Sequence, residues 1–272
     1  MTKMLKAVAI AALTVFGSAN AALINKVDLF SIDQAQITDG LADGLSVSSQ
    51  VGSAADNSIP LGLGTILGGY RELIIDKKSD GDGGSNTTKQ AKMDVAFGKL
   101  NFSTDTQTAG TGIIRWDGPT QSLTGGPIQP INVTGLGSVN LGNVLTDQFA
   151  LTTIFSDCGF VFRIEAYTNA TKWSAVDIVS NQHLVPATTF VPLDAFLACG
   201  FMYAVVTVTC GAMGPVDFSN LGALQAIIDP AGSFVSLDLT LDQVTVVPEP
   251  SGIALVGLAL LGLGVTARRR KA

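Results

Sequence analysis

The fold of this chain is decided by an alternating stretch close to its C-terminal end, FVSLDLTLDQVTV, at Phe234–Val246. Every second residue from Val235 to Leu241 is apolar, and the residues between them are Ser, Asp and Thr. A second stretch, VFRIEAY at Val161–Tyr167, alternates in the same way. A period of two predicts β-strands with one buried and one solvated face.

Working outward from these two stretches, we expect β-strands along the whole body, separated by Gly- and Asp-rich turns. At most one short helix or turn is expected, at Ser219–Leu224. Such a pattern predicts an all-β fold, an antiparallel two-sheet sandwich of the jelly-roll kind, in a single domain at residues 22–246. The expected strands are Lys26–Ile32, Tyr70–Asp76, Met93–Ser103, Gly112–Trp116, Phe160–Tyr167, Thr188–Pro192, Phe201–Thr209, Ala223–Ile228 and Phe234–Val246.

The body of the chain is acidic. Residues 22–247 hold ten Lys or Arg and twenty-one Asp or Glu, which gives a net charge of −11. Nucleic acids and anionic membranes need a basic face, so this balance disfavours both as partners of the body. Nineteen of the twenty-two acidic residues of the chain are Asp, which suits turns better than helices.

The first 21 residues have the layout of a secretory signal peptide. Lys3 and Lys6 precede an apolar run at residues 7–16, and small residues follow it. The tripeptide before Ala22 fits the small-residue cleavage rule, so we expect cleavage between Ala21 and Ala22 and export of the chain.

The last 26 residues, 247–272, have three parts in a fixed order. Pro248, Glu249 and Pro250 come first, an apolar run at residues 251–266 follows, and four cations close it: Arg268, Arg269, Arg270 and Lys271. The run is short for a membrane span, but the basic stop favours a tail helix that tethers the body outside the inner membrane. The two prolines are expected to break any preceding strand and leave a stiff, exposed, unpaired stem.

This three-part tail resembles the PEP-CTERM sorting signal of Gram-negative bacteria. The resemblance covers only Val247–Ala272. It implies that the triplet Pro248–Pro250 is recognised by an exosortase, a membrane protease, and that Arg268–Lys271 act as the basic stop. It further implies transit through the inner membrane, delivery to the cell surface or the extracellular matrix, and an association with exopolysaccharide and biofilm.

Three cysteines are candidates for one disulfide in an oxidising compartment: Cys158, Cys199 and Cys210. A continuous strand between Cys199 and Cys210 would hold them roughly 30 Å apart, so they can pair only if that segment folds back. Otherwise Cys158 would take one of them.

No set of residues converges on a catalytic reaction. His183, the only histidine, is expected on a surface loop, and a zinc site would need several His or Cys ligands. A glycosidase needs paired carboxylates. The two glutamates of the body, Glu72 and Glu165, lie beside Arg71 and Arg163 in alternating strands, where exposed faces are expected.

Two weaker sites are considered. Asp76, Asp80 and Asp82 resemble a calcium loop, but the EF-hand spacing fails and a solvated turn is favoured. Trp116 and Trp173 are candidate sugar contacts, although Trp116 ends an apolar run and fits the sandwich core equally well. No other cofactor is expected.

These observations predict an exported, non-enzymatic surface or matrix protein of structural or adhesive type, sorted by an exosortase. The first alternative is a carbohydrate-binding module for exopolysaccharide, and the second is a glycan hydrolase.

Overall fold

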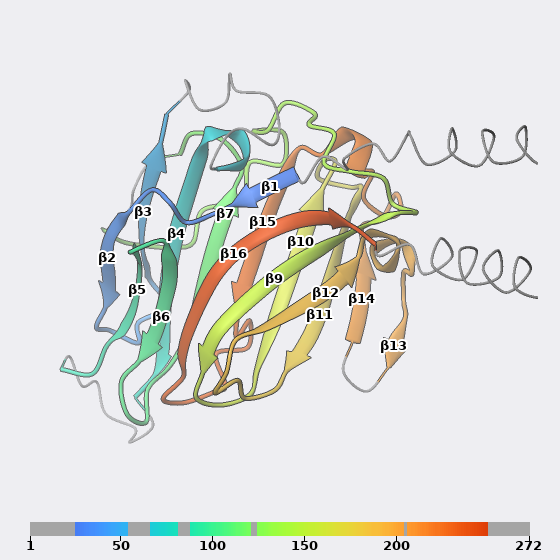
Figure 1. Ribbon diagram of the computed structural model, residues 1–272. Coiled ribbons are helices and arrows are strands. Elements are labelled where there is room, and N and C mark those ends of the chain that lie inside the picture. Colours follow the sequence, from blue (N-terminus) through green and yellow to red (C-terminus); the bar gives the residue numbers. More distant parts are fainter. Residues whose placement is uncertain (1–24, 54–65, 81–87, 121–123, 204–205, 250–272) are drawn as a thin grey trace, which may run out of the picture.

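A computed structural model describes residues 25–53, 66–80, 88–120, 124–203 and 206–249 (Figure 1). In this part of the chain the fold is all-β, with two antiparallel sheets lying face to face and only short 3-10 turns besides. The prediction of two antiparallel sheets is confirmed. The signal helix and the C-terminal helix that we expected fall outside the described residues.

One sheet has seven strands and lies at the front of Figure 1. β16 (Asp238–Pro248) lies near its middle and pairs with β9 along most of its length, while the short β1 pairs with the end of β16. On one side of β16 lie β9 (Asp147–Ser156) and then β12 (Ala187–Pro192). On its other side lie β6 (Lys99–Thr104), β5 (Ala91–Ala96) and β2 (Gln34–Asp39), in that order, and β1 (Asn25–Asp28) pairs only with β16.

The other sheet has nine strands and lies behind the first. Three of its central strands, β4 (Tyr70–Ser79), β7 (Ala109–Trp116) and β15 (Ala223–Ile228), are buried along most of their length. In spatial order its strands are β13 (Met202–Tyr203), β14 (Val206–Cys210), β11 (Trp173–Ser180), β10 (Phe160–Tyr167), β15 (Ala223–Ile228), β7 (Ala109–Trp116), β4 (Tyr70–Ser79), β3 (Ser46–Gly52) and β8 (Thr124–Gly126).

The core lies between the sheets and follows the alternation seen in the sequence. Leu239 and Leu241 of β16 are buried as predicted. Register shifts around Leu241 then change which residues face inward, so that Val244 and Val246 are buried next. Val235 is 49% exposed and precedes β16, so its place in the predicted apolar face is wrong.

Two predicted strands are in fact hairpins. Met93–Ser103 divides into β5 and β6, because Phe97 and Gly98 both take positive φ (54° and 73°), which is typical of a tight hairpin turn. Phe201–Thr209 divides into β13 and β14. The alternation within each half gave no sign of the reversal, so both were predicted as one strand.

Other parts of the sequence prediction missed elements. No strand was expected where the structure has β2, β3, β8, β9 and β11. The short helix or turn expected at Ser219–Leu224 is a 3-10 turn, η4 (Phe218–Asn220), and β15 follows it from Ala223. The other described 3-10 turns are η2 (Leu67–Gly69) and η3 (Leu193–Leu197).

A buried ion pair joins the two sheets. Arg71 of β4 donates from Nη1 to both carboxylate oxygens of Asp28 in β1, at 3.0 and 3.1 Å, and both side chains are fully buried. Arg71 also donates to Gln34 Oε1 at 2.9 Å. Arg71 shares the inner face of β4 with Leu73 and Ile75. The exposed faces that the sequence predicted for Glu72 and Glu165 are wrong, because both side chains are buried.

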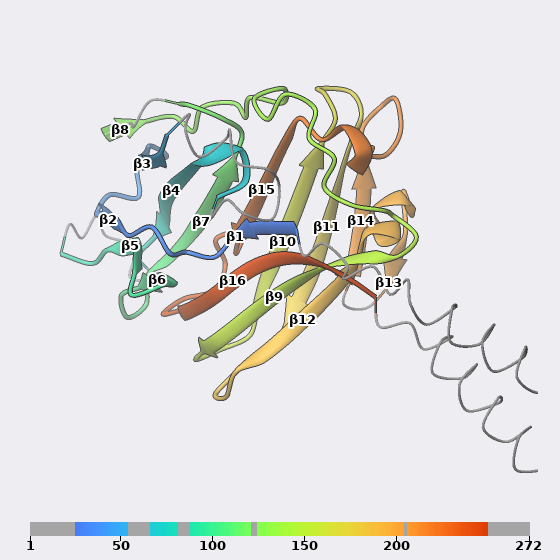
Figure 2. The same ribbon diagram turned by 45° about the horizontal axis from the view of Figure 1, so that its top comes forward.

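The two ends of the described chain lie beside each other. β1 runs antiparallel to the end of β16, with Asn25 opposite Val246 (Figure 2). The first described residue and the end of β16 are therefore neighbours in one sheet.

Candidate functional site

The outward face of the nine-stranded sheet carries a row of long polar side chains. Residues directly opposite each other on neighbouring strands share a face, so pairing register alone aligns them. Five strands contribute one residue each, in the spatial order Gln50, Glu72, Arg115, Gln225 and Glu165. Both glutamates of the body are thus in one row, which the sequence prediction did not find.

The half of this row on β4 and β7 is covered. Ile128 packs over three isoleucines of the neighbouring row, and Arg115 Nη1 donates to the backbone oxygen of Gln129 at 2.8 Å. Glu72 and Arg115 are consequently only 4% and 6% exposed, with 3.8 Å between Glu72 Oε2 and Arg115 Nη1. Burial raises the pKa of Glu72 above its ordinary value, although Arg115 opposes the shift.

The β10 end of the row is also buried, with the side chain of Glu165 11% exposed, but it lies beside partly exposed side chains. Tyr167 Oη donates to Glu165 Oε2 at 2.6 Å, and Gln225 Nε2 donates to the same oxygen. Burial and the hydrogen bond to Glu165 raise the pKa of the Tyr167 phenol. Glu165 therefore accepts one hydrogen bond from Tyr167 and one from Gln225.

An ion pair lies next to Glu165. Arg163 Nε and Nη2 donate to the two carboxylate oxygens of Asp177 at 2.5 and 2.9 Å, and Arg163 Nη1 lies 3.6 Å from Glu165 Oε1. The two partners are 33% and 25% exposed. The hydrogen bond to Asp177 raises the pKa of Arg163, so this guanidinium stays charged.

Two aromatic rings complete this part of the face. Tyr167 and Trp173 are cross-strand partners on β10 and β11, with ring centroids 5.9 Å apart and planes inclined by 31°. Gly211 lies against Trp173, and a Cβ there would come within 2.6 Å of Trp173 Cδ1. Glycine is needed at this position because a Cβ would clash first with the backbone oxygen of Thr171, at 2.3 Å, and then with the indole ring. We call these half-buried groups and Glu165 the open site: Arg163, Glu165, Tyr167, Trp173 and Asp177.

The open site combines two kinds of side chain that can contact a polar ring. Aromatic faces supply apolar contact, and the guanidinium and carboxylates supply directional hydrogen bonds. The two glutamates considered from the sequence for a glycosidase do not form a catalytic carboxylate pair. Glu72 and Glu165 are separated by three strand spacings, roughly 14 Å, which exceeds the roughly 9.5 Å limit for such pairs.

The other tryptophan named from the sequence is in the core. Trp116 is 1% exposed and donates from Nε1 to Asp28 Oδ2 at 3.0 Å. Its candidacy as a sugar contact is corrected, since a ligand cannot reach it. The sequence left open whether Trp116 contacts a sugar or packs in the core, and in the structure it packs in the core.

The aspartates considered for calcium are engaged by lysines. Asp76 Oδ2 pairs with Lys78 Nζ at 2.5 Å, and Asp80 pairs with Lys77. Asp82 lies outside the described residues. Among the residues that the structure describes, no group of three or more His, Cys, Asp or Glu side chains could hold a metal ion.

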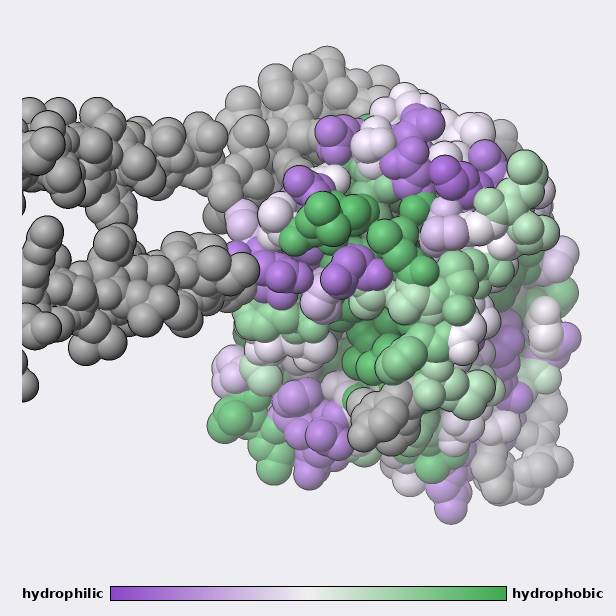
Figure 3. All heavy atoms as spheres, turned by 90° about the vertical axis from the view of Figure 1, so that its right-hand side faces the viewer, coloured by the Kyte–Doolittle hydropathy of each residue, from purple (hydrophilic) through white to green (hydrophobic). Residues whose placement is uncertain are grey.

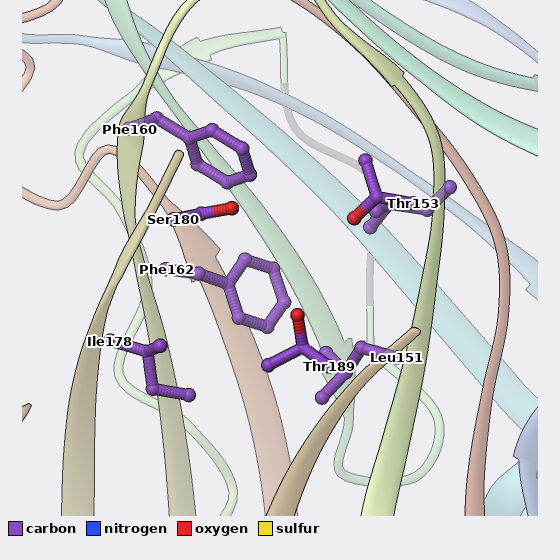
Figure 4. Close-up of a pocket in the computed structure, with 8 residues that line it drawn as sticks. Leu151, Thr153, Phe160, Phe162, Ile178, Ser180 and Thr189 are labelled. Atoms are coloured by element: carbon purple, nitrogen blue, oxygen red, sulfur yellow. The ribbon is translucent and has the colours of Figure 1, made fainter. Parts of the chain in front are cut away.

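His183 lies in the loop after β11 and is partly buried. Its Nε2 is 3.2 Å from Ser180 Oγ, and its backbone pairs with Ser156 of β9. Ser180 lines a cavity between the sheets together with side chains of β9, β10, β12 and β16, most of them apolar (Figure 4). The cavity holds about 20 Å³, which is room for one water molecule and no substrate.

The cysteines pair within the hairpin that the sequence reading missed. Cys199 and Cys210 form a disulfide with their Cα atoms 5.4 Å apart, and Cys158 keeps a free thiol whose pKa is raised by burial. Apolar side chains gather at this end of the molecule (Figure 3), which is the end of β13 and β14 in Figure 1. Met202 and Phe201 are 78% and 50% exposed, and the disulfide fixes the hairpin that carries them.

The Pro-Glu-Pro triplet begins inside the folded sheet. Pro248 is the last residue of β16 and lies opposite Asp147 of β9, and Glu249 N–H donates to Thr146 O at 2.6 Å. The expectation of an exposed, unpaired stem is therefore wrong for these two residues. Successive residues direct their backbone groups to opposite sides, so the missing N–H of Pro248 points away from β9 and that ladder loses no bond.

Pro250 and the basic residues Arg268–Lys271 lie outside the described residues, as do Ala21 and Ala22. Within the part of the chain that is described, no helix is long and apolar enough to cross a membrane.

Comparison with known families gives one match. Residues 246–271 match the family model of the PEP-CTERM protein-sorting motif. No curated protein matches the chain. The match begins at the end of β16 and includes the triplet and the basic residues, and from Pro250 onward it lies outside the described residues.

Proposed function

Because this chain is a PEP-CTERM protein, exported and targeted to an exosortase, we propose that its sandwich acts at the cell surface or in the extracellular matrix as a non-enzymatic structural or adhesive domain. The observation that carries this proposal is the state of its acidic side chains. In the polar row and the open site, Glu165, Asp177 and Glu72 each accept from, or pair with, a guanidinium, amide or hydroxyl group. Groups engaged in this way are suited to rigidity and recognition and poorly suited to transferring protons to a substrate.

The proposal is tested by comparing cells that produce the protein with cells that lack it. We expect weaker attachment and a less cohesive matrix without the protein, restored by a copy that carries the natural tail. The purified domain, residues 22–249, should show no turnover on panels of glycans and esters. Turnover that is lost in a Glu165→Gln variant would instead establish the hydrolase alternative.

One observation favours a second function, binding of exopolysaccharide. The open site places Tyr167 and Trp173 beside Arg163 and Asp177 on one accessible face. Aromatic faces flanked by charged hydrogen-bonding groups suit sugar rings, which present apolar faces and hydroxyl edges. We propose that a glycan chain would lie across β10 and β11.

Affinity electrophoresis with purified exopolysaccharide tests this second function. Trp173→Ala should lose at least roughly tenfold in affinity, because a stacked aromatic side chain contributes on the order of 1.4 kcal/mol or more. The matched control is Phe97→Ala, which removes a ring that is 97% exposed at the β5–β6 turn. Equal binding by the two variants and the wild type would reject the open site as the glycan site.

A further inference from the structure

We infer that this chain self-associates through β12, whose free edge pairs antiparallel with the same strand of a second copy. The inference goes beyond the proposed function and concerns a different part of the molecule from the open site. It follows from three features of β12, which are a free backbone edge, the lack of charge around that edge, and the exposed apolar side chains beside it.

β12 is the last strand at one end of the seven-stranded sheet (Figure 2). All of its residues, Ala187–Pro192, pair with β9 in an unbroken register. No described strand lies on its other side. A free edge of this kind exposes backbone donors and acceptors that can pair with another strand.

The pairing of β9 shows which residues of β12 direct their backbone groups to the free edge. Glu249 N–H donates to the oxygen of Thr146, the residue before β9, so Thr146 points towards β16. Backbone groups alternate in direction along a strand, so the odd-numbered residues of β9 as far as Thr153 point towards β12. Their partners on β12 are Ala187, Thr189 and Val191.

Thr188 and Phe190 therefore direct N–H and C=O away from β9. Among the described residues, none bonds to these backbone groups from the free side. An antiparallel copy centred on Thr189 places Thr188 of each copy opposite Phe190 of the other, so every exposed N–H meets a C=O across a two-fold axis. Pro186 and Pro192 are equally far from Thr189 and then lie opposite each other, so neither leaves a donor of the copy without an acceptor.

The region around this edge is uncharged in a strongly acidic molecule. Residues 178–193 contain no Asp, Glu, Lys or Arg, although residues 22–247 hold ten basic and twenty-one acidic residues. The residues of β9 that share the outward face with Phe190 are also uncharged, and they are Gln148, Ala150 and Thr152. Two acidic copies repel each other where charged faces meet, and at β12 they approach without that repulsion. The charge pattern thus favours a second copy as the partner of this edge.

The edge also lacks the usual protection against pairing. Natural edge strands carry charged residues, bulges or prolines that prevent another strand from adding. β12 has prolines only at its ends, and the apolar side chains beside it are exposed. Leu184, Val185 and Phe190 are 66%, 71% and 53% exposed. Pairing with a copy removes part of this apolar surface from water.

The other ends of the two sheets are poor partners in comparison. β13 and β8 have only two and three residues. β1 and β2 have irregularities in their register. Among the described strands, pairing through β12 therefore uses the one long and regular free edge of each copy, so association stops at a dimer and does not continue into a fibre.

Sedimentation equilibrium of the full chain tests the inference, in a buffer whose density hides the detergent. Pairing over residues 187–191 buries less than the roughly 1,200 Å² of a stable interface, so we expect weak association. The protein mass should rise from one chain towards two between about 1 µM and about 500 µM. A wild type that stays monomeric over this range overturns the inference.

Hydrogen exchange at the two ends of this range tests the edge itself. The amides of Thr188 and Phe190 should exchange at least roughly tenfold more slowly in the dimer, because they then donate to the copy. The amides of Thr189 and Val191 already donate to β9 and should change little. Slow exchange of Thr188 and Phe190 at the lowest concentration would show that a segment of the same chain covers the edge, and it would overturn the inference.

Two variants of the edge complete the test. Thr188→Pro removes an N–H that points away from β9, and Phe190→Lys adds a charge of the kind that protects natural edges. Each should raise the dissociation constant at least roughly tenfold. The matched control is Phe97→Lys, the same change at a ring that is 97% exposed on the β5–β6 turn, which should dimerise like the wild type.

Circular dichroism shows whether each variant keeps its β-structure, and either edge variant decides the question if the other fails to fold. A folded edge variant that dimerises as strongly as the wild type would overturn the inference, because the contact would then lie elsewhere on the chain.

Discussion

Two Arg–Asp pairs of this molecule have the same chemistry and opposite surroundings. Arg71 and Asp28 join the two sheets and are fully buried, whereas Arg163 and Asp177 join neighbouring strands on the outward face and are 33% and 25% exposed. Both guanidinium groups contact both oxygens of their carboxylate. The two pairs therefore share their contacts and differ in how deeply they are buried.

The comparison shows how one interaction serves two purposes. Inside the sandwich, water cannot solvate a charge that loses its partner, so the inner pair constrains how the sheets pack. Burial raises the pKa of Asp28 despite the opposing charge of Arg71, which shows how strongly this environment disfavours a charge. On the outward face, water solvates a charge that loses its partner at little cost in free energy, so the groups of the outer pair are available to a ligand.

The largest expected effect comes from breaking the inner pair. Arg71→Ala should lower the free energy of unfolding by about 3–5 kcal/mol, because it leaves Asp28 buried without its guanidinium partner. Urea unfolding followed by tryptophan fluorescence measures the change. Arg163→Ala is the matched control and should cost less than about 1 kcal/mol. Equal losses in the two variants would contradict the comparison.

The two tryptophans extend the comparison to apolar groups. Trp116→Ala should cost about 3–5 kcal/mol, because it leaves a cavity and removes the donor to Asp28 Oδ2. Trp173→Ala removes a half-buried ring and should cost clearly less, while it weakens glycan binding. Thermal unfolding and affinity electrophoresis on the same samples separate the two effects. A Trp116→Ala domain as stable as the wild type would refute its core role.

The covered half of the polar row gives a pH dependence. The pKa of Glu72 is raised in the folded protein above its ordinary value of 4.5, so the folded state binds this proton more tightly than the unfolded state does. The contribution of Glu72 to stability is therefore full below pH 4.5 and declines as the pH rises through the raised pKa. Arg115 lowers this pKa and Asp117 raises it.

Glu72→Gln should remove that decline. Urea unfolding at several pH values between 4 and 8 should show that the stability of the wild type relative to Glu72→Gln falls with rising pH. A constant difference between the wild type and Glu72→Gln across this range would refute the assignment.

The smallest expected effect is at the outer pair. Asp177→Asn should change the free energy of unfolding by less than about 1 kcal/mol, and the change should shrink further in high salt. Chemical unfolding at low and high ionic strength measures it. A loss above about 2 kcal/mol would show that the open site is a structural element like the inner pair.

Alternation was a reliable guide where a strand has one buried face. β10 was predicted with its observed bounds, because Phe162 and Ile164 face the core while Arg163 and Glu165 do not. Alternation failed at chain reversals, since each half of a hairpin alternates as a single strand does. It also missed β9 and β11, whose stretches contain several adjacent polar or adjacent apolar residues.

The candidate site was predictable only in part. Trp173 was named from the sequence, and alternation places Arg163, Glu165 and Tyr167 on one face of a strand. Only the pairing of β10 with β11 brings these residues to Trp173 and Asp177. The inner role of Arg71 had a signal that was overlooked. Arg71 alternates with Leu73 and Ile75, which places its side chain on the apolar face of β4.

The all-β fold and the PEP-CTERM sorting motif could both be recognised from the sequence, because both depend on the local order of residue types. The tertiary structure alone decided which ion pair is buried, which tryptophan a ligand can reach, which cysteines pair, and that the sorting motif begins within a sheet. These depend on which strands become neighbours and on which face the segment at residues 124–129 covers. Contacts between residues far apart in the chain fix both, and no local pattern records them.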